Sequence, residues 1–146
     1  MKILFHKEPK YLTPQIVICN HELNQEVKEL QEKITQIFTK ELVVYDEYGA
    51  TLVPIADIVR IYSENQKVYV QTQEMIGSLR ERLYSIEEKL TEHKFIRISN
   101  SELVNMHKIK RLDTSMTGTI KMELVGNLEA FVSRRNVSKI KKVLGI

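Results

Sequence analysis

The chain has 146 residues, of which 42% are hydrophobic and 28% are charged. This length allows one hydrophobic core with a small appendage, and the composition is that of a folded protein rather than a disordered one. No apolar run approaches the roughly 20 residues that a membrane helix needs, and the N-terminus carries no export signal pattern. We therefore expect a cytoplasmic protein without a membrane span.

Residues suited to metal binding or catalysis are scarce. Cys19 is the only cysteine, which excludes an internal disulfide and a cysteine metal cluster, and its apolar neighbours predict a packing role. The four histidines share no helix or strand spacing, and the five glycines form no phosphate-binding loop. No set of nucleophile, base and orienting group can be assembled. We expect no enzymatic activity, no metal site and no cofactor.

Positive charge is concentrated in the C-terminal part of the chain. Residues 1–57 hold six lysines against nine acids, a charge of −3, and the remaining residues bring the total to +3. Residues 133–142 contain no acid and carry Arg134, Arg135, Lys139, Lys141 and Lys142. This distribution favours a polyanionic partner such as a nucleic acid. The alternative is a solvated helix face whose cations suit the C-terminal end of the helix dipole.

Residues 1–41 predict a short strand followed by a helix. The β-prone run Gln15–Cys19 predicts the strand, and Asn20 is a suitable helix N-cap. Apolar residues then recur at intervals of four and three and form one helix seam: Leu23, Val27, Leu30, Ile34 and Ile37. Two heptads are too few for an independent coiled coil, so the seam either packs on the rest of the chain or pairs with its copy in a dimer.

From residue 42 onward, short β-prone runs follow one another through loops too short for crossover helices, which excludes a parallel α/β architecture. The predicted strands are Leu42–Tyr45, Thr51–Pro54, Ile58–Tyr62, Val68–Thr72, one that ends near Leu83, Phe95–Ser99, Ile109–Leu112, Thr119–Val125 and Leu128–Val132. Helices are expected at Leu83–Thr91 and at Asn136–Leu144, and Gly126-Asn127 suits a two-residue primed turn. The predicted fold class is mostly β (α+β), with small antiparallel sheets and two short helices over residues 42–146.

Two blocks near the C-terminus carry a family resemblance. Residues 95–109 read FIRISNSELVNMHKI, and residues 131–143 read FVSRRNVSKIKKV. Preceded by the strands Asp57–Tyr62 and Lys67–Val70, they resemble the LytTR family of bacterial DNA-binding domains over about residues 42–146. The resemblance implies an elongated fold of small antiparallel sheets. It also implies that loops, rather than a recognition helix, enter successive major grooves of double-stranded DNA.

Carried over to this sequence, the resemblance places candidate DNA contacts in three loops. The base-contact candidates are Asn65 and Lys67 in the first loop, Asn100 in the second and Arg135 in the third. These types suit the task, since Arg can bind a guanine edge with two hydrogen bonds and Asn an adenine edge. The phosphate-contact candidates are Ser101, Arg134 and Lys139.

Each candidate also has a structural alternative. Asn100 could instead cap a turn before Glu102, and Arg97 is expected to be a structural residue on the outer face of a strand. His107 is expected to pack or to bind backbone rather than to contact DNA.

The N-terminal part of the chain departs from the commonest pattern of the family. Many relatives join this domain to a phosphoacceptor receiver of over a hundred residues, whereas here only about 41 residues precede residues 42–146, which we call the body. The short extension looks like that of stand-alone LytTR regulators, which are often associated with a small integral-membrane inhibitory protein. The resemblance thus implies a protein partner, rather than phosphorylation, as the regulatory input.

Together these features predict a transcriptional regulator that binds duplex DNA sequence-specifically, as a homodimer on paired short sites. The alternative is a protein-interaction module or anti-activator whose heptad helix binds a partner and whose basic face is incidental. RNA binding is disfavoured, because the chain has four Phe, six Tyr and no Trp and lacks an evident pair of stacking aromatic residues.

Overall fold

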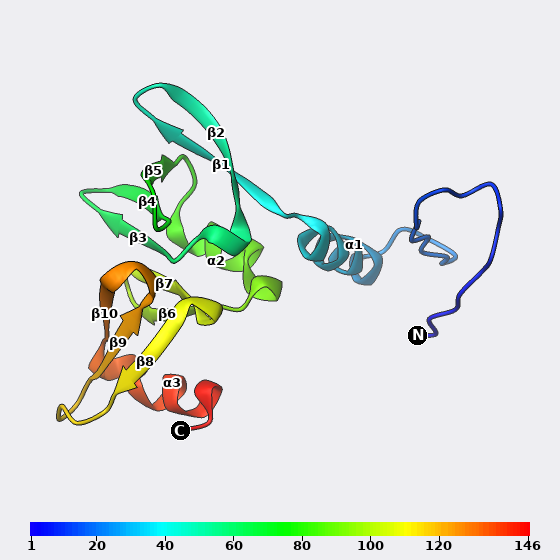
Figure 1. The fold of residues 1–146 in the computed structure, drawn as a ribbon. Coiled ribbons are helices and arrows are strands. Elements are labelled where there is room, and N and C mark those ends of the chain that lie inside the picture. The colour runs from blue at the N-terminus through cyan, green and yellow to red at the C-terminus, as the bar shows by residue number, and fades with distance from the viewer.

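All paired strands are antiparallel in the computed structural model, which describes residues 1–146 (Figure 1). The helices are α1 (Gln25–Phe38), α2 (Leu83–Lys89) and α3 (Val137–Leu144). The strands are β1 (Glu41–Asp46), β2 (Gly49–Pro54), β3 (Arg60–Glu64), β4 (Lys67–Gln71), β5 (Ile76–Leu79), β6 (Phe95–Ser99), β7 (Glu102–Asn105), β8 (Ile109–Asp113), β9 (Ile120–Leu124) and β10 (Leu128–Val132). The prediction of a mostly β fold with two short helices in the body is confirmed.

The strands form two sheets with separate hydrophobic cores. The larger sheet has the order β2-β1-β5-β4-β3-β7-β6, and the smaller has the order β10-β9-β8. Alternate residues of the large sheet, such as Val44, Ile61 and Leu103, are fully buried with Ile86 of α2. Ile140 of α3 is buried with the inner residues of β9 and β10 in the second core. Period-two alternation of this kind is what the sequence runs indicated.

Gly77 lets β5 approach β1 closely. A Cβ atom built at Gly77 would lie 2.3 Å from Val44 Cγ1 and 3.0 Å from the Tyr45 carbonyl oxygen. We expect Gly77→Ala to lower the free energy of unfolding by about 1–3 kcal/mol in chemical denaturation, because overpacking forces side chains and backbone to shift. Val44→Ala would remove part of the clash. Strictly additive effects of the two substitutions would contradict this explanation.

The predicted strand at Gln15–Cys19 is wrong, because the chain forms no strand before β1. A β-prone run needs a neighbouring strand to satisfy its backbone, and none lies beside this one. Helix α1 is capped by Asn24, whose Oδ1 accepts a hydrogen bond from Val27 N at 3.0 Å, so Asn20 is not the N-cap. Cys19 is exposed rather than packed.

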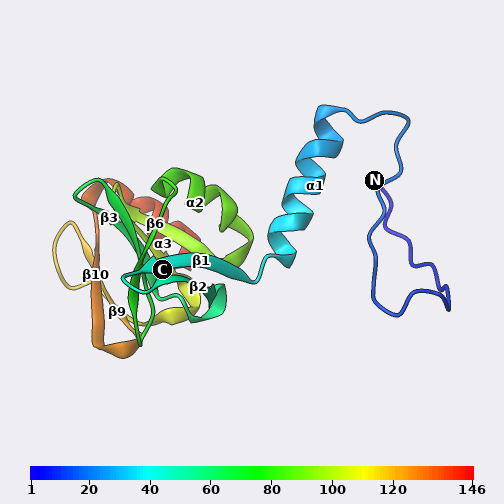
Figure 2. The same ribbon diagram turned by 90° about the horizontal axis from the view of Figure 1, so that it is seen from above.

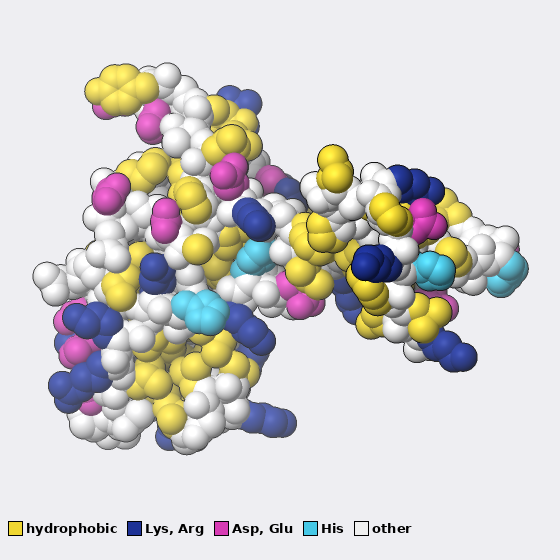
Figure 3. Space-filling model, turned by 45° about the vertical axis from the view of Figure 1, so that its right-hand side comes forward, with side chains coloured by type: hydrophobic (Ala, Val, Ile, Leu, Met, Phe, Trp, Pro, Cys, Tyr) yellow, Lys and Arg dark blue, Asp and Glu magenta, His cyan; other side chains and the backbone are white.

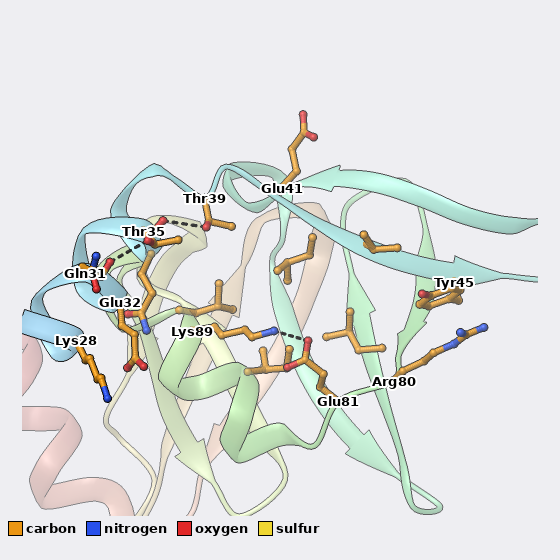
Figure 4. Close-up of a pocket in the computed structure, with 16 residues that line it drawn as sticks. Lys28, Gln31, Glu32, Thr35, Thr39, Glu41, Tyr45, Arg80, Glu81 and Lys89 are labelled. Carbon is orange, nitrogen blue, oxygen red and sulfur yellow. Dashed lines mark hydrogen bonds and ion pairs between the residues drawn. The ribbon is translucent and has the colours of Figure 1, made fainter. Parts of the chain in front are cut away.

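Helix α1 projects from the body and touches it at one end (Figures 1 and 2). The Gln36 carbonyl oxygen lies 2.8 Å from Nε2 of His93, in the 3₁₀ turn Thr91–His93 that follows α2. The polar side of the helix, including Lys28, Gln31 and Glu32, lines a groove of about 840 Å³ against β1 and α2 (Figure 4). The helix therefore turns its polar side toward the body.

The apolar seam of α1 is not covered by the body. Leu23, which precedes the helix, is 65% exposed, and Ile37 is 53% exposed. Val27 and Ile34 line a separate hollow with Ile16 and Ile18 of the N-terminal segment. Figure 3 shows hydrophobic side chains gathered on this extension. Of the two predicted arrangements, packing of the seam on the body is therefore wrong.

No helix of the chain has the length and apolar character to cross a bilayer.

Candidate nucleic-acid interface

The three loops with the candidate DNA contacts lie next to one another, although up to 70 residues separate them in sequence. The backbone N–H of Ser63, on β3 two residues before the first loop, donates to the Ser101 carbonyl in the second loop at 2.8 Å. The N–H of Ser133, where the third loop begins, donates to the Ile98 carbonyl at 2.9 Å, just before the second loop. These two hydrogen bonds place the β6–β7 turn between the other two loops.

The first loop is a tight turn between β3 and β4. Glu64 pairs with Lys67, so only Asn65 and Gln66 connect the strands. Both have left-handed backbone conformations, with φ of 49° and 64°. Such a primed turn matches the twist of the flanking strands. The turn leaves the base-contact candidates Asn65 and Lys67 exposed at its tip.

The second loop is formed by Asn100 and Ser101, both exposed. Ser99 Oγ lies 3.3 Å from Ser101 N and accepts its hydrogen bond. The Asn100 carbonyl accepts a hydrogen bond from Arg97, while the Asn100 side chain makes none within the chain. The turn-capping alternative for the Asn100 side chain is thus wrong. Its amide is free for an external partner.

Arg97 has the structural role that its place in the strand predicts. It lies on β6 and is half-buried, with hydrogen bonds to Ser99, Asn100 and Glu87. His107, in contrast, has an exposed side chain. Its backbone N–H donates to Oδ1 of the buried Asn105 at 3.0 Å, but its imidazole makes no hydrogen bond within the chain, so the expected packing or backbone-binding role of the His107 side chain is not observed.

The third loop links β10 to α3 through the 3₁₀ turn Arg134–Asn136. Asn136 Nδ2 donates to Ser133 Oγ at 2.6 Å and closes this turn. Arg134 and Arg135 are exposed, and neither forms an ion pair. Lys139 is also exposed and unpaired on the first turn of α3. The loop and the first turn of α3 therefore combine three cations that form no ion pair with a carboxylate of the chain.

A partly buried polar cluster around Arg60, at the end of β3 opposite to the first loop, was not predicted. Arg60 donates to Gln71 Oε1 at 2.7 Å, to Glu102 Oε1 at 3.1 Å and to the Glu129 carbonyl at 3.4 Å. Burial raises the pKa of Glu102, and this effect outweighs the lowering by Arg60. The cluster joins the large sheet to the small one. Only the strand register brings Arg60 and Glu102 together, so no local sequence signal could have revealed it.

The comparison with known families decides the classification. Residues 48–145, more than half of the chain, match the family model of the LytTr DNA-binding domain. The protein belongs to the LytTR family. The resemblance inferred from residues 95–109 and 131–143 is therefore confirmed, and this LytTR protein carries a DNA-binding domain of a transcriptional regulator.

Relatives and a solved structure agree with this classification. A protein named as an HTH-type transcriptional regulator in Staphylococcus aureus strain bovine RF122 is 35% identical over 105 residues, covering 72% of this chain and 71% of that protein. The corresponding protein of strain NCTC 8325 is 34% identical over the same length. The solved LytTr DNA-binding domain from Bacillus cereus has a TM-score of 0.71 and 24% identity, covering 74% of this chain and 99% of that domain.

The LytTR protein has no helix-turn-helix unit, despite the name of those relatives. Such a unit needs two helices joined by a short turn, whereas α2 and α3 are separated by five strands. Helix α1 is separated from α2 by another five strands. Base recognition by a helix-turn-helix unit is therefore excluded for this fold.

Proposed function

We propose that this LytTR protein regulates transcription by sequence-specific binding of its loops to successive major grooves of double-stranded DNA. The observation that carries the proposal is the alignment of three exposed loops whose Asn100 and Arg135 side chains have no partner within the chain. Arg135 suits a guanine edge and Asn100 an adenine edge. In the first loop, Asn65 and Lys67 are the base-contact candidates.

Phosphate contacts would provide affinity and fix the position of these loops on the duplex. Ser101, Arg134 and Lys139 suit this role, because they flank the base-contact candidates and are exposed. Contacts from cations to phosphate release counterions, so binding weakens as salt concentration rises. Ser101 offers a hydroxyl group, which adds a hydrogen bond without a charge.

We further propose that the protein acts as a homodimer through the α1 seam and binds two short sites. The seam faces away from the body and leaves Leu23 and Ile37 more than half exposed. Pairing with a second copy would bury it and would raise the affinity for paired sites by linking two modest interactions. Such a protein acts on chromosomal DNA and would therefore work in the cytoplasm.

The same seam supports a second candidate function, that of a protein-interaction module or anti-activator. Its partner would be another protein, such as the small integral-membrane inhibitor that the family resemblance implies. The exposed apolar side chains of the seam are the observation that favours it. A transcriptional regulator requires that affinity depend on the DNA sequence, whereas an interaction module with an incidental basic face does not. Selection of bound duplexes from a random pool therefore distinguishes the two functions.

The test is selection of bound duplexes from a random pool with the full chain. We expect recovery of a pair of short motifs whose centres lie about one helical turn apart, because a dimer places two copies on one DNA face. Recovery of one motif without a repeat would contradict the homodimer but would still support sequence-specific binding of DNA. Failure to enrich any motif would contradict the regulator and favour the interaction module.

A further inference from the structure

We propose that Arg97 is a positioning residue for DNA recognition, which holds the β6–β7 turn in the conformation that presents Asn100. This inference rests on the proposed function and deepens it. It assigns to Arg97 an effect on base discrimination, although Arg97 itself does not contact DNA.

The guanidinium group of Arg97 binds both the turn and a neighbouring helix. Its Nε donates to the Ser99 carbonyl at 2.7 Å, and its Nη2 donates to the Asn100 carbonyl at 2.5 Å. Its Nη1 donates to Glu87 Oε2 on α2 at 2.9 Å. The planar fork of an arginine can satisfy these three acceptors at fixed angles. Arg97 therefore connects two consecutive carbonyl groups of the β6–β7 turn to helix α2.

The β6–β7 turn needs such support because its own backbone is not of the favoured hairpin type. Ser99 pairs with Glu102, so Asn100 and Ser101 form a two-residue connection. Neither has a positive φ, unlike Asn65 and Gln66 in the β3–β4 turn. Unprimed two-residue turns tend to splay the flanking strands. The pairing of β6 with β7 also shifts register between Arg97 and Ser99, and bulges of this kind redirect side chains.

The surroundings of Arg97 argue against a direct DNA contact. Its side chain is only 23% exposed, and three of its five N–H groups donate within the chain. Glu87 compensates its charge. These hydrogen bonds orient the guanidinium group toward the turn and Glu87. Arg97 should therefore affect discrimination between sequences and leave the salt dependence of binding unchanged.

The experiment compares the affinity ratio of the selected duplex over a scrambled duplex for five proteins: the wild type, Arg97→Ala, Asn100→Ala, the double variant and Lys89→Ala. Lys89 is an exposed cation of α2 that pairs with Glu81 at 2.5 Å and lines the groove, so its removal breaks an ion pair of the same helix that carries Glu87 and serves as the control. We expect Arg97→Ala to lower the ratio at least about fivefold, the lower limit for one lost base contact. Lys89→Ala should leave the ratio unchanged.

Two further readouts separate positioning from other roles. In the Asn100→Ala background, Arg97→Ala should cause no further loss of the ratio, because both act through one side chain. The slope of log affinity against log salt should stay that of the wild type. Arg97→Lys retains the charge but not the fork, and an intermediate ratio is expected. This variant provides the test if Arg97→Ala does not fold, as judged by circular dichroism at the assay temperature.

The inference is overturned if a folded Arg97 variant keeps the wild-type ratio, or if its loss adds fully to that of Asn100→Ala. It is also overturned if the salt slope falls by about one unit, which would indicate a phosphate contact of Arg97 itself. A wild-type protein without sequence preference would instead refute the proposed function, and this inference with it.

Discussion

Replacement of Arg135 by Ala is expected to weaken binding of the selected duplex by about 1–3 kcal/mol and to relax the preference at one base pair. Arg135 is exposed at the 3₁₀ turn before α3, and no carboxylate of the chain pairs with it. Its removal leaves no buried group unsatisfied, so the thermal midpoint of unfolding should stay close to that of the wild type. The loss should appear as altered base preference when selection is repeated with the variant.

Lys139→Ala is the matched control for Arg135→Ala. Lys139 is an exposed cation on the first turn of α3, next to the same loop. We expect Lys139→Ala to weaken binding to all duplexes about equally, because a phosphate contact carries no sequence information. It should also reduce the slope of log affinity against log salt concentration by about one unit. If Arg135→Ala shows the same uniform loss, the assignment of Arg135 as a base contact is wrong.

The second large effect is expected from Leu30→Asp with Ile34→Asp in the α1 seam. Dimer formation would bury these side chains, and two carboxylates without partners make that burial unfavourable. We expect a monomer in analytical ultracentrifugation, and an affinity for the paired site that falls by about 10²–10⁴-fold, toward that for a single site. Affinity for a single site should not change, because the seam lies away from the reading loops.

The control for this substitution makes the same change of charge on the other side of α1. Lys28 lines the groove toward the body and not the hollow beside the seam, so Lys28→Asp, which changes the net charge by the same two units, should leave the dimer intact. A wild-type chain that is monomeric at all accessible concentrations would contradict the homodimer. A monomer whose seam variants lose binding to another protein would support the interaction module.

Most of the body could be predicted from the sequence because its core follows local patterns. The runs Phe95–Ser99 and Leu128–Val132 are strands with the predicted bounds, and Gly145 ends α3 in the left-handed conformation. Gly126 and Asn127 both have positive φ, as the predicted turn requires. The connection between the paired ends of β9 and β10 has three residues, Val125–Asn127, instead of the two that were predicted. Strand β7 was missed, because its residues Leu103, Val104 and Asn105 are all buried and show no alternation.

The extension was less predictable because its structure depends on neighbours. Gln15–Cys19 has strand propensity, yet propensity alone cannot supply the partner strand that a sheet requires. The seam of α1 was evident from its spacing, whereas the spacing did not reveal that α1 meets the body through a contact of Gln36 with His93. These residues are 57 positions apart in the chain, so their contact leaves no trace in a local pattern.

The candidate DNA contacts came from the family resemblance, and the residues that support them came from the structure. Arg97 was predicted to be structural from strand alternation alone. Its three acceptors, and the cluster of Arg60 with Glu102, depend on how β6, β7 and α2 meet. A turn conformation and a strand register determine those contacts. Sequence spacing could identify the exposed tips of the loops but not the hydrogen bonds that hold them.

The most direct test of sequence recognition is titration of the full chain with the selected duplex and a scrambled duplex of equal length at two salt concentrations. Phosphate contacts are common to both duplexes, so salt should weaken both affinities in parallel. We predict that their ratio stays at about 10³ or more at the higher concentration, as for sequence-specific DNA-binding proteins. A ratio near one, with binding to both duplexes lost as salt rises, would contradict the account.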